Sequence, residues 1–163
     1  MITAKSEPVF GGVYKLVAIE EPDGTVIPKI KVSENVEKIT IPHFKKVYRL
    51  YNRDNGKAIA DYMTVHDEVV DENEPLMLFD PYATWKTKNV CNFEARELLV
   101  PVFLNGKKVY QSPALKDIQA YCKQQVNTLW DEIKRFDNPQ TYYVDLSQKL
   151  WDIQQELLWK NRN

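Results

Sequence analysis

Residues 46–65 read KVYRLYNRDNGKAIADYMTV, two runs rich in β-branched and aromatic residues on either side of Asn55-Gly56. An Asn-Gly pair supplies the positive φ angles that a tight hairpin needs, because glycine has no Cβ to clash with the backbone. The stretch therefore predicts an antiparallel hairpin and indicates that this region is rich in β-structure.

Two further pairs, Asp23-Gly24 and Asn105-Gly106, predict hairpins by the same argument. They account, with Asn55-Gly56, for three of the five glycines. The expected strands, in chain order, are Val13–Ile19, Thr25–Val32, Lys46–Tyr51, Ala58–Val65, Leu76–Phe79, Thr84–Lys88, Leu98–Leu104 and Lys107–Gln111.

The first expected strand, Val13–Ile19, has apolar side chains on both faces. Such a strand is typical of a barrel or a central sheet that is covered on both sides. We interpret it as a strand left over from an α/β barrel, and expect residues 1–32 to be disordered or covered by another copy. Lys15 lies inside this strand, where an unpaired buried charge would be costly. Two interpretations are open for Lys15: an ordinary salt bridge or an anion site. The same two apply to the polar residues that follow the first hairpin, Lys29, Lys31, Ser33 and Lys38.

The last third of the chain predicts two amphipathic helices. Ser112-Pro113 is a helix start, and apolar residues then recur at intervals of three and four as far as Asn138-Pro139, which ends the helix. A second helix is expected near Asp145, with Gln148 as its capping-box partner. Antiparallel hairpins followed by two such helices predict an α+β fold.

Length and charge narrow the class of protein. The chain has 163 residues, the size of one domain, and 22 basic against 23 acidic residues. Near-neutrality argues against a surface built for nucleic acid. The longest apolar run, Leu98–Leu104, is too short to span a bilayer, which needs about 20 residues. The N-terminus has no secretion signal, and the sparse cysteines Cys91 and Cys122 suit a reducing compartment, so we expect a cytoplasmic protein with no membrane partner.

The residues that carry most enzyme chemistry are scarce. His43 and His66 have no partner at metal-ligand spacing, and the acidic run 67–74 lacks the pattern of a calcium loop and predicts a solvated loop. The remaining glycine pair, Gly11-Gly12, precedes a strand instead of opening a helix, so no phosphate cradle is expected. We therefore expect no catalytic residue, metal site or cofactor within this chain.

One segment, Lys45–Arg53, alternates cations with aromatics, as the stacking surfaces of single-strand binders do. The alternative is an amphipathic strand whose long cationic side chains lie over the core. The neutral net charge favours the second interpretation.

Eight segments, taken in order, resemble the C-terminal part of the bacterial nicotinate phosphoribosyltransferase family. The resemblance covers nearly the whole chain without large gaps. The segments are Gly11–Ala18, Pro28–Glu34, Glu37–Thr40, Phe44–Leu50, Phe79–Pro81, Thr84–Lys86, Asn92–Pro101 and Tyr142–Ser147.

The resemblance implies a function. That family makes nicotinate mononucleotide from nicotinate and phosphoribosyl pyrophosphate in NAD salvage, with magnesium and with ATP hydrolysis coupled through a phosphorylated histidine. The family's catalytic histidine and phosphate loop precede the matching region, so we expect a fragment, inactive alone, whose partners are the remainder of the parent enzyme and other copies in a homo-oligomer. Residues 1–42 would be the remnant of the barrel and residues 43–163 the C-terminal accessory domain.

Few individual residues carry over from the resemblance. Lys15, Lys31, Ser33 and Lys38 match family positions near the end of the barrel and are our candidate substrate-binding residues. The family usually has glycine where this chain has His43, which implies a different turn. Related enzymes bring an arginine to the neighbouring subunit's site from the segment that here reads Ser6-Glu7-Pro8. The alternative functions are a β-rich nucleic-acid-binding module that uses Lys45–Arg53, and a structural assembly domain.

Overall fold

The computed structural model describes residues 12–161, so Gly11 and Ser6-Glu7-Pro8 lie outside the described residues. Strands and helices are mixed along this part of the chain, which confirms the α+β class. The chain divides into two compact units. One contains the residues up to Phe44 and those from Ile153 onward, and the other is Lys45–Asp152.

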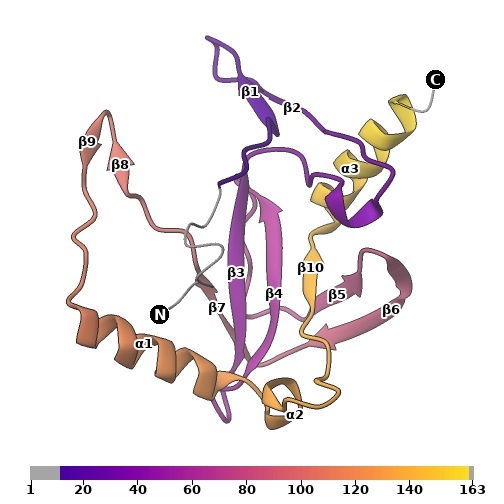
Figure 1. The fold of residues 1–163 in the computed structure, drawn as a ribbon. Helices are drawn as coiled ribbons and strands as arrows, with labels where there is room; N and C mark the ends of the chain where they lie inside the picture. Colours follow the sequence, from indigo (N-terminus) through magenta and orange to yellow (C-terminus); the bar gives the residue numbers. More distant parts are fainter. Residues whose placement is uncertain (1–11, 162–163) are drawn as a thin grey trace, which may run out of the picture. The chain divides into compact units, whose positions relative to one another are not determined.

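A four-stranded sheet forms the centre of the unit Lys45–Asp152 (Figure 1). Strands β3 (Lys45–Asn52) and β4 (Ala58–Val65) pair antiparallel across a turn in which Gly56 has a φ of 66°, a value that suits glycine. Strand β7 (Phe93–Glu97) pairs antiparallel with β3, and β10 (Val144–Leu146) pairs parallel with β4. The sheet order is therefore β10-β4-β3-β7.

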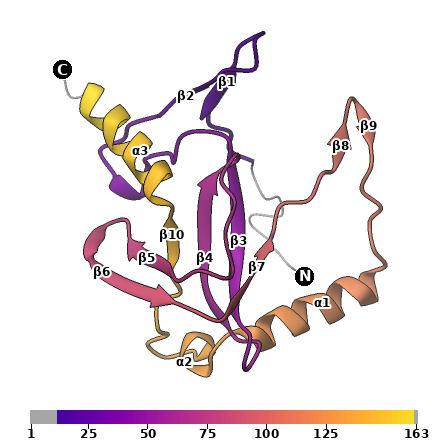
Figure 2. The ribbon, with the colours of Figure 1, turned by 180° about the vertical axis from the view of Figure 1, so that it is seen from behind.

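A second hairpin supplies the other side of the core. Strands β5 (Leu76–Asp80) and β6 (Ala83–Val90) pair antiparallel and form their own two-stranded sheet, which Figure 2 shows from behind. Their buried residues join those of β3, β4 and β7 in one cluster. That cluster contains Tyr48, Leu50, Ala60, Tyr62, Leu78, Val90 and Phe93.

The segment after β7 carries a small hairpin and two helices. Strands β8 (Phe103–Leu104) and β9 (Lys107–Lys108) pair antiparallel across Asn105 and Gly106, whose φ angles of 49° and 74° are those of a two-residue hairpin turn. Helix α1 (Leu115–Thr128) has no buried residue, and α2 (Asp131–Lys134) is a single turn. No described helix is both long and apolar enough to cross a membrane.

The other unit is built from short elements. Strands β1 (Ala18–Glu20) and β2 (Val26–Pro28) pair antiparallel, and a 3-10 helix, η1 (Val36–Lys38), follows them. The unit also contains the end of helix α3 (Gln148–Lys160), from Ile153 onward.

The expected first strand is largely wrong. Only its last two residues, Ala18 and Ile19, belong to β1. Its expected partner strand, Thr25–Val32, shortens to β2. The side chains of Val13, Tyr14 and Leu16 are 79%, 95% and 64% exposed, so this segment is not covered on either face. Strands β1 and β2 form a sheet of two strands only, and such an isolated hairpin is marginally stable in water, which agrees with its short length.

The expected strand Leu98–Leu104 shortens to its last two residues, which form β8. Pairing with β3 ends at Glu97, and Pro101, which has no N–H to give to a ladder, precedes the next strand at Phe103. The sequence interpretation missed β7 and β10. The partner strand Lys107–Gln111 shortens to β9.

Three helix boundaries differ from expectation. Helix α1 begins at Leu115 after Ala114, which gives no side-chain cap, so Ser112 is not the cap. The expected continuous helix breaks at Leu129 and Trp130, both extended, because the Trp130 indole donates to the carbonyl of Ala58 at 3.0 Å. Asp145 lies in β10 and is not a helix cap. Ser147 takes that role, since its Oγ accepts from the Leu150 amide at 3.2 Å.

Candidate functional site

Three of the four candidate substrate-binding residues lie in one loop. The backbone N–H of Lys31 donates to Thr40 Oγ1 at 2.8 Å and the N–H of Thr40 donates to the Lys31 carbonyl at 3.3 Å, which closes the loop. Ser33 lies inside it and accepts a hydrogen bond from the Asn35 amide, and Lys38 ends η1. The side chains of Lys31 and Lys38 are exposed.

Lys15 lies outside this loop, in the segment before β1. Its side chain is exposed, so the expected problem of a buried charge does not arise. The nearby carbonyl of Val17 accepts from the amides of Lys29 and His43, both at 2.8 Å, which joins this segment to the chain on either side of the loop. None of the four candidates lines either of two pockets found in the unit Lys45–Asp152.

The segment Lys45–Arg53 forms part of the core instead of a stacking surface. Tyr48 and Tyr51 are 9% and 8% exposed, so neither ring can stack on a base. Arg53 forms an ion pair with Glu72 and donates to the Phe93 carbonyl at 2.7 Å. Burial lowers the pKa of Lys45. The cations and aromatics of this segment thus stabilise the fold, and the nucleic-acid alternative is not favoured.

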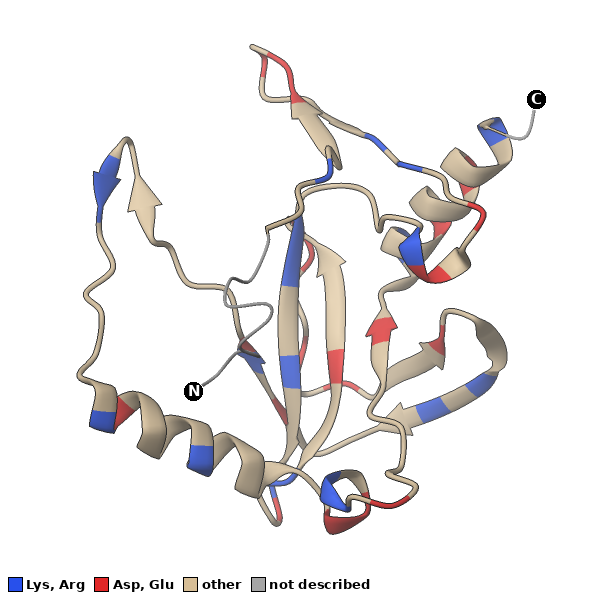
Figure 3. Ribbon diagram, in the orientation of Figure 1, with Lys and Arg blue, Asp and Glu red and all other residues tan. Residues whose placement is uncertain are grey.

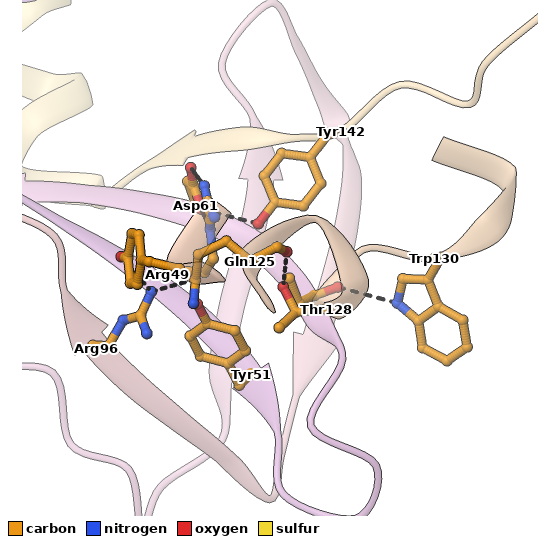
Figure 4. A network of polar contacts seen from close by, with 10 residues as sticks. Arg49, Tyr51, Asp61, Arg96, Gln125, Thr128, Trp130 and Tyr142 are labelled. Carbon is orange, nitrogen blue, oxygen red and sulfur yellow. Dashed lines mark hydrogen bonds and ion pairs between the residues drawn. The ribbon is translucent and has the colours of Figure 1, made fainter. Parts of the chain in front are cut away.

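On the outer face of the sheet, Arg49 pairs with Asp61 through two hydrogen bonds of 2.8 and 3.0 Å (Figure 4). The hydroxyl of Tyr142 donates to the same carboxylate at 2.9 Å, and the guanidinium of Arg49 lies 5.6 Å from the centre of the Tyr142 ring. Burial and the neighbouring Asp61 charge raise the pKa of Tyr142. This tyrosine is therefore a structural donor and is not a base at neutral pH.

A second cluster in Figure 4 fixes the end of α1 to the sheet. Gln125 Oε1 accepts from the Tyr51 hydroxyl at 2.9 Å and from the Arg96 guanidinium at 2.6 Å. Lys57 Nζ donates to the carbonyls of Asn127 and Leu129, at the C-terminal end of the same helix. Both clusters hold elements together, and neither leaves a reactive group free to act on a substrate.

The acidic run also has a structural role that the sequence interpretation missed. Glu68 Oε2 accepts from the Val65 amide at 2.6 Å and from the Ser147 hydroxyl at 2.7 Å. Glu72 Oε1 accepts from the Ala95 amide at 2.8 Å. The prediction of a solvated loop therefore holds for exposed Asp71 and is wrong for these two glutamates.

The unit Lys45–Asp152 contains a pocket of about 720 Å³. Residues of β4, β5, β6, α2 and β10 line it, together with the segments around them. Aromatic side chains from three of these segments, Phe79, Trp130 and Tyr143, are among the lining residues. Figure 3 shows basic residues in β6 and an acidic residue in β10, two of the strands that contribute to it.

Asp145 is the most unusual group in the pocket. It is 5% exposed, and its Oδ1 accepts no hydrogen bond from any described residue. Burial and the nearby Asp80 carboxylate raise the pKa of Asp145 to about 6, against a smaller opposite effect of Lys88. The sequence interpretation placed Asp145 at a helix start. The β-type run 142–146 was the signal that could have placed it in a strand.

Within residues 12–161, no group of three or more metal-ligating side chains is close enough to hold an ion. Cys91 and Cys122 are both exposed, free thiols.

Comparisons with known proteins agree with one family. The sequence model of the nicotinate phosphoribosyltransferase C-terminal domain matches residues 44–154. Nicotinate phosphoribosyltransferase of Bacillus subtilis is 44% identical over 151 residues, which cover 93% of this chain and 31% of that protein. Nicotinate phosphoribosyltransferase of Caenorhabditis elegans is 32% identical over 163 residues, covering 99% of this chain and 28% of that protein.

The fold agrees as well. A crystal structure of human nicotinic acid phosphoribosyltransferase superposes with a TM-score of 0.72 at 24% identity, over 91% of this chain and 27% of that one. The chain belongs to the nicotinate phosphoribosyltransferase C-terminal domain family. It spans about a third of the length of the curated relatives that it matches.

Proposed function

We propose that this chain serves as the C-terminal region of an enzyme that joins nicotinate to phosphoribosyl pyrophosphate, giving nicotinate mononucleotide in NAD salvage. The observation that carries the proposal is the 44% identity to the Bacillus subtilis nicotinate phosphoribosyltransferase along 93% of the chain. We propose that magnesium and ATP serve the parent enzyme and that its catalytic residues and metal site belong to the remainder of that enzyme. The remainder of the parent enzyme is its main partner, in a cytoplasmic homo-oligomer.

The contacts of the described residues favour a structural role in that reaction. Their polar clusters, such as Arg49 with Asp61, are used in hydrogen bonds between elements of the fold. Transfer to a pyrophosphate-bearing substrate needs preorganised cations or amides around the leaving group.

We propose that residues 1–42 are the remnant of a barrel and that 43–163 form the accessory domain. The exposed apolar side chains of Val13, Tyr14 and Leu16 support this division.

A chimaera tests the function. This chain replaces the matching C-terminal third of the Bacillus subtilis enzyme, and product formation is measured with nicotinate, phosphoribosyl pyrophosphate, magnesium and ATP. We expect the chimaera to have a rate within about tenfold of the parent enzyme, which corresponds to a barrier change of at most about 1.4 kcal/mol. The isolated chain should give no product. A folded chimaera without activity, or enzyme-like turnover by the chain alone, would refute the proposal.

The same chimaera tests the candidate substrate-binding residues Lys15, Lys31, Ser33 and Lys38. We propose that their cationic and hydroxyl groups lie near the mouth of the substrate site. Lys31→Ala and Lys38→Ala should then raise the KM for phosphoribosyl pyrophosphate more than that for nicotinate, because the former is the more highly charged anion. Lys107→Ala and Lys123→Ala, at exposed lysines elsewhere, are the matched controls. Equal KM values for all four variants would exclude the role.

A further inference from the structure

The pocket around Asp145 has a buried carboxylate whose hydrogen-bonding capacity is unfilled. In the parallel pairing of β10 with β4, Asp145 lies beside Tyr62, and laterally paired residues of a sheet project from the same face. Tyr62 belongs to the hydrophobic cluster of the core. Asp145 is therefore a carboxylate on the core-facing side of the sheet, where desolvation of an unpaired charge is costly.

Within residues 12–161, no hydrogen-bond or ion-pair partner relieves this cost. Asp145 Oδ1 has no hydrogen-bond donor among the described residues, and no described ion pair includes this side chain. Two charged residues act on the pKa of Asp145: Asp80 raises it, and Lys88 lowers it with the smallest of the three effects. Lys88 is exposed, whereas Asp80 is half-buried. The lining thus has negative charge at the buried Asp145 and the half-buried Asp80, whereas its lysines, Lys86 and Lys88, are exposed.

The rest of the pocket suits a small organic molecule. Its volume of about 720 Å³ falls within the range of about 300–1,000 Å³ that is usual for such sites. Trp130 is held in place by its hydrogen bond to Ala58, and Phe79 is fixed by an edge contact with Trp151, with ring centres 6.0 Å apart. Aromatic faces attract organic cations, and most strongly where water is excluded.

We propose that this pocket binds a small organic cation with N–H donors, an alkylamine or a guanidinium group, which pairs with Asp145 and lies against the aromatic residues of the wall. A cation fits both features, since its N–H groups can donate to the Asp145 carboxylate that lines the pocket and its charge offsets the negative charges of Asp145 and Asp80. The group can arrive as a free small molecule or as an arginine or lysine side chain of a protein segment. The inference does not depend on the proposed function.

Isotope-edited NMR titration of the 163-residue chain with matched probes tests the site. The probes are Nα-acetyl-arginine amide, its neutral isostere Nα-acetyl-citrulline amide, and butylguanidine. We expect the arginine amide to bind about tenfold more tightly than the citrulline amide, because a hydrogen bond to a charged group is worth more than a neutral one. The backbone amides of Tyr143, Asp145 and Lys88 should shift. Equal affinities of the arginine and citrulline probes would overturn the proposal.

Variants decide whether Asp145 is the partner. Asp145→Asn should weaken binding of the arginine amide about tenfold, and Asp137→Asn, at an exposed aspartate outside the pocket, should leave it unchanged. Unchanged binding by folded Asp145→Asn contradicts the assignment. If that variant does not fold, Asp80→Asn takes its place and should weaken binding about threefold, since it acts only through space. Unchanged binding in Asp80→Asn would then overturn the proposal.

The comparison of butylguanidine with the arginine amide distinguishes the two sources of the cation. Butylguanidine carries the same single guanidinium charge without peptide groups, so binding as tight as that of the amide indicates a free small molecule. Tighter binding of the amide indicates an arginine side chain delivered by a protein segment. Both results agree with the proposal, and absence of binding by both probes overturns it.

Discussion

Arg49 and Asp61 lie directly opposite each other on β3 and β4, and their side chains form a bidentate ion pair with N–O distances of 2.8 and 3.0 Å. The two side chains are only 21% and 13% exposed. The pair therefore lies in a region where water screens the charges little, and it links the two central strands of the sheet to Tyr142, which precedes β10.

Removal of the Asp61 charge should destabilise the protein. Asp61→Asn leaves the Arg49 guanidinium without its anionic partner, and we expect the free energy of unfolding to fall by about 1–3 kcal/mol. Urea denaturation followed by circular dichroism measures this change. Lys149→Gln, which breaks the exposed pair with Asp67, should leave the midpoint unchanged. A loss for Asp61→Asn no larger than that of this control would contradict the prediction.

Gln125→Leu should loosen helix α1 without unfolding the sheet. A helix of 14 residues with no buried side chain is marginal on its own, so its order depends on the contacts of Gln125 with Tyr51 and Arg96. Hydrogen–deuterium exchange should show faster exchange across Leu115–Thr128 and little change in β3 and β4. Gln124→Leu, at the adjacent exposed position, is the control. Equal exchange in both variants would argue against this tether.

His43→Gly should be better tolerated than His43→Ala. His43 has a φ of 74°, in the left-handed region where a Cβ is strained, and both variants lose the same imidazole contacts. We expect the glycine variant to be more stable than the alanine variant by about 1 kcal/mol in thermal unfolding. At Arg135, with a φ of −63°, alanine should instead be the more stable of the two. The same order at both positions would show that the backbone of His43 is not strained.

Asp145 should make stability fall as the pH rises from about 4 to about 6. The pKa of Asp145 is about 6 in the folded protein against 3.8 for an unperturbed aspartate, so the folded state holds a proton that the unfolded state has lost in this window. The slope of the free energy of unfolding with pH is therefore negative there, and the loss persists above pH 6. The charged or titratable neighbours that face Asp145 are Tyr62 of β4, Asp80 of β5 and Lys88 of β6.

Asp145→Asn should remove this dependence, because the amide has no charge to desolvate. At neutral pH we expect the variant to be more stable than the parent by up to about 3 kcal/mol, the value of a shift of this size, and at pH 4 nearly equal to it. Denaturation at a series of pH values, with Asp137→Asn as control, measures the difference. A variant that is less stable at neutral pH would show that the buried charge is satisfied.

The central hairpin was predictable from sequence because its determinants are local. Asn55-Gly56 sets the turn, and the alternation on each side sets the strands. The other sheet partners were not predictable in this way: β7 and β10 are short, and their place is decided by pairing with residues far along the chain. The break at Leu129 was not predictable either. The continuous apolar periodicity favours a longer helix, and a long-range hydrogen bond from Trp130 to β4 overrides it.

The pocket could not be predicted from the residues that line it, because none belongs to a motif. Asp145 looked like a helix cap, and its burial follows only from the register of β10 on β4. The prediction of the function depended instead on the ordered resemblance over many short segments, each of which is weak evidence by itself. The lysines of the loop Lys31–Thr40 matched family positions, but nothing in their local pattern distinguishes a substrate contact from ordinary surface charge.

The parallel pairing of β10 with β4 has a consequence for synthesis on the ribosome. The β3–β4 hairpin is complete long before Val144 leaves the exit tunnel, since Asp61 pairs with Val144. During that interval the outer backbone groups of β4 have no strand beside them, and such an edge can recruit a neighbouring nascent chain. Pairing of β10 closes this edge once Leu146 has left the tunnel, so premature stop codons upstream of β10 should yield aggregates more readily than missense changes within it.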